Sequence, residues 1–124
     1  MTITTLAVDD PITADKINEV IDAINAISFS WVNFNGVSGV AIRASFGNIS
    51  GVTRISSGAY RIGFSTEKAN ANYMTVGSCY PTNGNDTGFV VIAFQGTTHM
   101  DIHCRNDDGG LNDSPIICLT IIGG

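Results

Sequence analysis

Apolar residues recur with two different periods along the chain, and the change of period divides it in two. Between residues 13 and 28 they fall at i, i+3, i+4, i+7 and i+10, the stripe of an amphipathic helix. From Phe29 onward they alternate with polar residues, as they do in half-buried strands. We therefore predict an extended segment over 1–12, a helix over 13–28 and a β-domain over 29–124.

The predicted helix has a start signal and a narrow apolar seam. Thr13 can act as its N-cap, and no Gly or Pro interrupts residues 13–28. β-branched residues occupy both core positions of a heptad, which favours coiled coils of three or more chains. The seam consists of Ile17, Val20, Ile21, Ile24 and Ile27. A helix of about 15 residues is marginal in water, so we expect it to pack in a trimeric coiled coil or, alternatively, on its own sheet.

The region after residue 28 contains short strand patterns separated by turn signals. The predicted strands are 31–34, 40–46, 60–64, 73–80, 89–94, 98–104 and 116–122. Turns rich in Gly, Asn, Asp and Ser lie between several of them, around residues 56–58, 83–86 and 106–110. Seven or eight short strands at this spacing predict an antiparallel β-sandwich, which we expect to be jelly-roll-like.

Two of the predicted strands are apolar on both faces, namely 89–94 and 116–119. An antiparallel sheet commonly has one face in the core and the other in water. The outer face of these strands is therefore expected to meet another chain, or else to be covered by a loop or the helix of the same chain. The first alternative is a second indication of a homo-oligomer.

Charge and composition exclude several classes of function. Only 14% of the residues are charged while 44% are hydrophobic, so the chain is not of the disordered type. The net charge is −5, most of it in residues 1–28, and there is no basic stripe that would bind nucleic acid. No run of about 20 apolar residues predicts a membrane span. The first residues lack a signal-peptide pattern, so we expect assembly in a cytoplasm.

The three cysteines, Cys79, Cys104 and Cys118, are odd in number and form no C-x-x-C pair. Each lies in an apolar, strand-like stretch, where a free cysteine behaves as a small hydrophobe. We therefore expect three free thiols and no disulfide framework.

Residues 10–18 and 24–26 belong to the predicted helix and the segment before it, and residues 31–36, 40–50, 58–64, 71–77 and 116–123 belong to the predicted β-domain. Together these segments resemble the short helix and small β-domain of tail fibres and other virion proteins of tailed bacteriophages. The resemblance implies a trimeric fibre or knob, of the tail-fibre or head-fibre type, with no catalytic residues. It does not say where on the virion the protein sits, and we expect residues 1–12 to attach it to capsid, tail or baseplate proteins.

The candidate contact residues lie in polar or aromatic loop positions. They are Tyr80, Asn83, Asn85, Asn106, Asp107, Asp108 and Asn112. These side chains would face a host-surface glycan, or they would only form turns. The last four of these residues, together with Asp113, could also bind calcium through their carboxylate and amide oxygens. Their order along the chain does not match an EF-hand.

A weak metal candidate lies in one predicted strand. His99, Asp101 and His103 alternate, so a strand would project all three from one face, where they could hold a transition metal on a trimer axis. The simpler interpretation is that they are solvated. No nucleophile–base pair, P-loop or dinucleotide motif is present, and we expect neither enzymatic activity nor a cofactor.

The expected function is that of a non-enzymatic virion structural protein, a short trimeric fibre whose β-sandwich knob adheres to the host surface. One alternative is a head fibre or cement protein that decorates the capsid and is anchored through residues 1–12. Another is a stand-alone trimeric carbohydrate-binding module.

Overall fold

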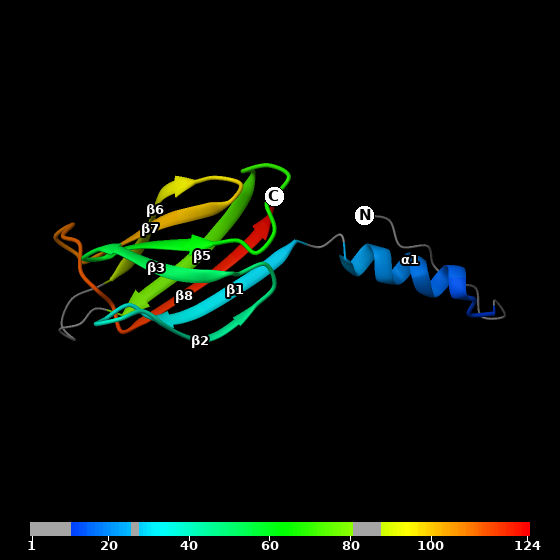
Figure 1. Cartoon of the computed structure of the whole chain (residues 1–124), viewed down its shortest axis with the longest axis horizontal. Coiled ribbons are helices and arrows are strands. Elements are labelled where there is room, and N and C mark those ends of the chain that lie inside the picture. Colours follow the sequence, from blue (N-terminus) through cyan, green and yellow to red (C-terminus); the bar gives the residue numbers. More distant parts are fainter. Residues whose placement is uncertain (1–10, 26–27, 81–87) are drawn as a thin grey trace.

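The computed structural model describes residues 11–25, 28–80 and 88–124. They form one helix and eight strands (Figure 1). The elements in chain order are α1 (Ala14–Asn25), β1 (Phe29–Asn35), β2 (Ala41–Phe46), β3 (Gly51–Ser56), β4 (Ala59–Gly63), β5 (Tyr73–Tyr80), β6 (Phe89–Gln95), β7 (His99–Arg105) and β8 (Ile116–Gly123).

The strands form two antiparallel sheets of four strands each. The first sheet has the order β2-β1-β8-β5, and the second has the order β3-β4-β7-β6. The mainly β, antiparallel fold expected from the alternating pattern is therefore confirmed. The jelly-roll winding is not shown by this order, because β1/β2, β3/β4 and β6/β7 pair as simple hairpins within one sheet.

The inner faces of the two sheets share one hydrophobic core. On β1, Val32 and Phe34 point inward and are buried, while Trp31, Asn33 and Asn35 are only half-buried. The Phe34 ring meets the Tyr60 ring of β4 edge-on, with 5.4 Å between their centroids. Burying one large apolar side chain of this kind contributes about 1.5–3 kcal/mol. This core fixes which face of each strand points outward.

Two details of the sequence prediction need correction. The strand β3 was not predicted, because it is an edge strand whose residues are mostly exposed and so lack strong alternation. The predicted helix end at residue 28 is wrong, since Ser28 lies outside α1. The start is right: the backbone N–H of Lys16 donates to Thr13 Oγ1 at 3.3 Å, as an N-cap requires.

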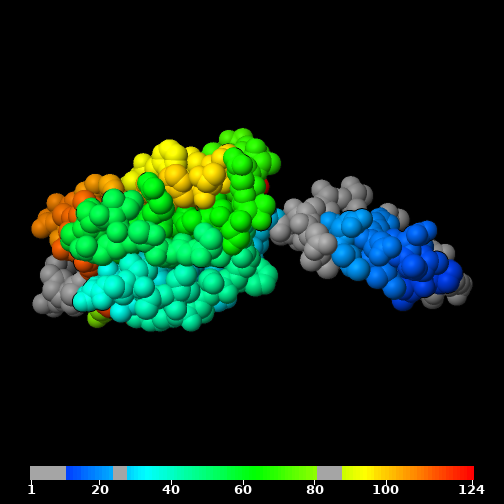
Figure 2. All heavy atoms as spheres, viewed as in Figure 1, coloured from blue at the N-terminus to red at the C-terminus, as the bar shows by residue number. Residues whose placement is uncertain are grey.

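The helix α1 lies outside the sandwich and does not cover either sheet (Figures 1 and 2). Its apolar side chains consequently remain open to solvent in the single chain. The alternative that this helix packs on its own sheet is therefore wrong. Within the described residues, no helix has the length and apolar character needed to cross a membrane.

Candidate functional site

The first candidate surface is the apolar side of α1. Ile17, Val20 and Ile21 are 49%, 45% and 46% exposed, and we call these three residues the stem stripe. With Ile12 and Lys16 they line a shallow hollow of about 280 Å³ on the helix. The Ile24 side chain and Ile27, the other two predicted seam residues, lie outside the described residues. The described part of the seam thus forms one continuous unpacked surface, with Asp15 and Asp22 among its exposed polar neighbours.

The second candidate surface is the outer face of the first sheet. Strand alternation turns Trp31 outward while its neighbour Val32 enters the core. The strand register then places Trp31 beside Phe46 of β2 and Thr120 of β8, and Thr120 beside Val76 of β5. A row of mixed aromatic, aliphatic and hydroxyl side chains therefore crosses all four strands.

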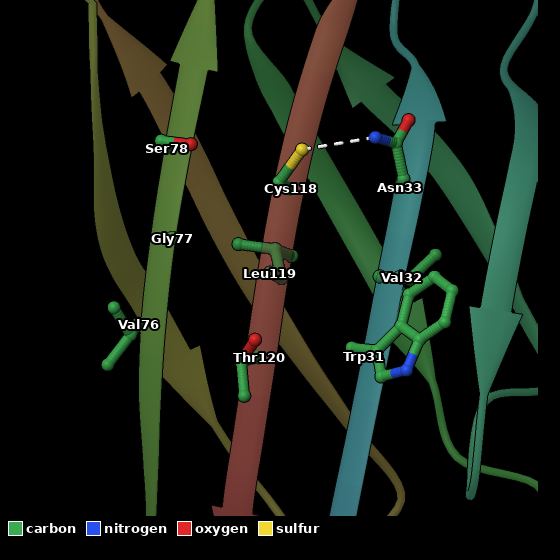
Figure 3. Close-up of a pocket in the computed structure, with 9 residues that line it drawn as sticks. All are labelled: Trp31, Val32, Asn33, Val76, Gly77, Ser78, Cys118, Leu119 and Thr120. Atoms are coloured by element: carbon green, nitrogen blue, oxygen red, sulfur yellow. Dashed lines mark hydrogen bonds between the residues drawn. The ribbon is translucent and has the colours of Figure 1, made fainter.

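A shallow groove of about 380 Å³ opens on this face across β1, β8 and β5 (Figure 3). Trp31 and Val76 lie on opposite sides of it, and Thr120 lies between them. We call this feature the Trp31 groove. Its outward-pointing side chains are Trp31, Asn33, Val76, Ser78, Cys118 and Thr120.

The polar end of the Trp31 groove is held by hydrogen bonds. Asn33 Nδ2 donates to Cys118 Sγ at 3.1 Å, and Arg43 Nη1 donates to Asn33 Oδ1 at 3.4 Å. The hydroxyl groups of Ser78 and Thr120 complete the polar lining. A flat indole beside an amide and hydroxyl groups can stack against a ring and hydrogen-bond its substituents. The groove is thus suited to a small polar ring such as a sugar.

The rest of this outer face is apolar. Ile116 and Ile122 are 43% and 41% exposed there, as expected for a strand that is apolar on both faces. Met74 of β5 is exposed in the row beside Ile122, and the rings of Phe29 and Phe46 lie 6.2 Å apart. Large exposed apolar patches on a soluble domain commonly mark interaction surfaces.

The weak metal candidates share the outer face of the second sheet, as their alternation predicted. Asp101 is engaged by Arg61, whose Nε and Nη2 lie 2.8 and 2.9 Å from its two oxygens, and this pair holds the pKa of Asp101 below its usual value. The His99 ring stacks on Phe94 at 5.0 Å. Among the residues that the structure describes, no three His, Cys, Asp or Glu side chains gather closely enough to hold a metal ion.

The predicted contact loop over residues 106–113 lies at the end of the sandwich away from α1 (Figure 1). Asn106 and Asp108 both accept hydrogen bonds from the backbone N–H of Gly110, at 2.7 and 3.1 Å, so they shape a turn. Asp107 and Asn112 are exposed, and Tyr80 is exposed at the end of β5. The candidates Asn83 and Asn85 lie outside the described residues.

Sequence reasoning assigned Trp31 to a strand but did not recognise it as part of a site. The signal was available: with Val32 and Phe34 in the core, Trp31 must point outward, where a large aromatic residue is unusual without a partner. Its neighbours in the groove come from distant segments, around residues 76–78 and 118–120, which the sequence alone does not bring together.

Comparisons with protein-family models, with curated proteins and with solved structures found no match to this chain. The resemblance to phage fibre domains therefore rests on the residue segments quoted above.

Proposed function

We propose that this chain is a non-enzymatic virion structural protein that assembles as a homotrimer, with α1 as the trimeric coiled-coil stem and the β-sandwich as its exposed knob. The observation that carries the proposal is the stem stripe, which lies away from the sandwich and is about half exposed at each of its three residues. The resemblance to phage fibre domains supplies the virion setting.

The energetic argument concerns what can cover the stem stripe. A 12-residue helix is too short to be stable alone in water, and α1 gains no packing from the sandwich. Parallel association of three copies would place Ile17 and Val20 at heptad core positions and bury them against their symmetry mates. The acidic residues Asp15 and Asp22 would remain in water.

In this arrangement the two ends of the molecule have different roles. Residues 1–12 precede the stem and would attach it to the capsid, tail or baseplate. The loop over residues 106–113 lies at the far end of the sandwich, so it and Tyr80 would be presented outward. Adhesion to a host-surface glycan would then involve this end or the outer face of the first sheet.

The test is the mass of the protein in solution. Sedimentation equilibrium should show wild-type trimers, and the double variant Ile17→Asp/Val20→Asp should be monomeric because it places charges in the seam. The matched control Asn18→Asp/Asn25→Asp adds the same charge at heptad positions outside the seam and should stay trimeric.

The near-ultraviolet circular dichroism signal of Trp31 would show for each variant that the knob is folded. A wild-type monomer, or a seam variant that remains trimeric with a folded knob, would contradict the proposal.

The Trp31 groove favours a second candidate function, that of a carbohydrate-binding module. Its supporting observation is the indole beside Asn33, Ser78 and Thr120. On a glycan array, wild-type protein should bind and Trp31→Ala should lose the signal. The control Phe94→Ala removes an aromatic side chain that is 48% exposed on the other sheet and should bind normally. An array without binding by the wild-type protein would contradict this function.

A further inference from the structure

Two of the three cysteines meet inside the sandwich, although they belong to different sheets. Cys79 lies on β5, one of the two edge strands of the first sheet, and Cys104 lies on β7 in the second sheet. Both side chains line one small cavity of about 10 Å³, and Cys79 packs against the core cluster that contains Cys104. Cys104 is 1% exposed and Cys79 is half-buried against the core.

The third cysteine lies on the opposite side of its sheet. Cys118 of β8 belongs to the lining of the Trp31 groove, where its sulfur accepts the Asn33 amide. Its neighbours along β8, Ile117 and Leu119, are the residues that enter the core. Cys118 therefore faces outward, and only Cys79 and Cys104 are placed for an intramolecular bond between the sheets.

We propose that Cys79 and Cys104 form a reversible disulfide that joins the two sheets when the protein meets an oxidising medium that contains a low-molecular-weight disulfide. Both thiols are free in the structure, which therefore represents the reduced form. The bond would connect an edge strand of one sheet to a central strand of the other. Immunoglobulin domains likewise have a disulfide between their two packed sheets.

The chemistry is a two-step thiol–disulfide exchange. The Cys79 thiolate attacks one sulfur of oxidised glutathione, which breaks the glutathione disulfide, forms a mixed disulfide on Cys79 and releases one reduced glutathione. The Cys104 sulfur then attacks the Cys79 sulfur and releases the second reduced glutathione. The protein loses two electrons and two protons in total, and the glutathione disulfide gains them.

The surroundings of the pair decide which thiol reacts first. Burial raises the pKa of both thiols and raises that of Cys104 far more, so Cys79 is the better attacking group. Cys79 is also the more accessible of the two. Because β5 is hydrogen-bonded to a neighbour on one side only, it can shift to bring the two sulfurs to bonding distance.

The bond would stabilise the fold chiefly by restricting the unfolded chain, since it closes the loop between β5 and β7. It would form once the folded, reduced protein meets the oxidising disulfide. The inference is independent of the proposed function, because it depends only on the two sheets and the thiols between them.

The experiment uses the full-length reduced protein under native conditions with oxidised glutathione. After alkylation, mass spectrometry should find a Cys79–Cys104 link in the monomeric chain and Cys118 still alkylated. The midpoint of thermal unfolding should rise by at least about 5 °C and return on reduction. The variant Cys118→Ser should behave as wild type, whereas Cys79→Ser should show neither the link nor the rise.

Mass spectrometry of the alkylated wild-type protein can by itself contradict the proposal. The proposal fails if all three thiols are still alkylated after exposure, if glutathione stays attached to Cys79 without ring closure, or if the only bridges run through Cys118 between chains.

Discussion

The hydroxyl group of Tyr60 and the carboxylate of Asp113 are joined by a 2.8 Å hydrogen bond between β4 and the segment that leads into β8. The carbonyl oxygen of Gly36 lies 3.0 Å from the same hydroxyl group, and the backbone N–H of Ser114 donates to it at 3.4 Å. Asp113 Oδ1 also accepts the backbone N–H of Gly58 at 2.9 Å. These four hydrogen bonds together tie the segments around Gly36, Gly58 and Asp113 to the buried Tyr60.

The variant Tyr60→Phe should destabilise the knob by about 1–3 kcal/mol, because it leaves the buried N–H of Ser114 and one oxygen of Asp113 without this partner. Denaturant unfolding followed by tryptophan fluorescence measures the loss. The control Tyr73→Phe removes a hydroxyl group that donates one hydrogen bond, to the carbonyl oxygen of Gly96 at 2.9 Å. This control should lower the free energy of unfolding by less. Equal losses would show that the Tyr60 network has no special role.

Stability should fall as the solution becomes acidic. Arg54, which hydrogen-bonds Asp113 through Nε and Nη2, lowers the pKa of Asp113 in the folded state, and Arg61 does the same for Asp101. A lowered folded pKa stabilises the fold above the ordinary carboxyl value of 3.8, and this stabilisation is lost as the pH falls below it.

Denaturation midpoints measured between pH 7 and pH 2.5 should therefore drop more steeply for the wild type than for Asp113→Asn. The variant should already be less stable than the wild type at pH 7, because an amide cannot replace the charged partner of Arg54. Parallel pH curves for the two proteins would contradict the assignment of this acid sensitivity to Asp113.

Gly36 lies where the Tyr60 ring allows no side chain. A methyl group at Gly36 would overlap the Tyr60 hydroxyl group and ring, so Gly36→Ala should destabilise the knob by roughly 1–3 kcal/mol. Gly51→Ala is the matched control, because a methyl group there meets no atom within 4 Å. Thermal unfolding of both variants measures the difference. Similar unfolding midpoints for the two variants would contradict the close approach of the Tyr60 ring to Gly36.

Two adjacent isoleucines on β8 allow the contribution of core packing to be measured separately from that of association between chains. Ile117 is fully buried, so Ile117→Ala should cost about 2–5 kcal/mol of unfolding free energy. Ile116 points outward and is 43% exposed, so Ile116→Ala should leave the stability of a single chain nearly unchanged. If Ile116→Ala lowers the sedimenting mass instead, the outer face of the first sheet is part of an interface between chains.

Alternation along the chain was sufficient to place most of the strands. It works for β1 and β7 because one face of each is buried and the buried residues alternate along the strand. The strand β8 was predicted from its apolar run instead, since its outer face also carries Ile116 and Ile122. Alternation fails for β3, where Thr53 and Arg54 face a largely solvent-exposed edge and Ile55 lies at a register shift in the pairing with β4. The helix start was predictable from its cap, since capping is a local interaction.

The contacts that define the sites could not be predicted in the same way. Tyr60 and Asp113 are 53 residues apart, and Cys79 and Cys104 become neighbours only through the packing of two sheets. Lys68 is a further case. Its Nζ is buried between the rings of Phe64 and Tyr73 and donates to the carbonyl oxygen of Gly123 at 2.7 Å, a position that its sequence neighbours do not indicate.

The strand that follows the helix, β1, is hydrogen-bonded on both sides, to β2 and to β8. A load applied at α1 and resisted at the far end of the sandwich would act along the axis of this strand. Antiparallel ladder bonds lie perpendicular to the strands, so such a pull shears them together instead of opening them one after another. The domain should therefore resist tension applied from the α1 side better than a domain whose terminal strand is peeled off one hydrogen bond at a time.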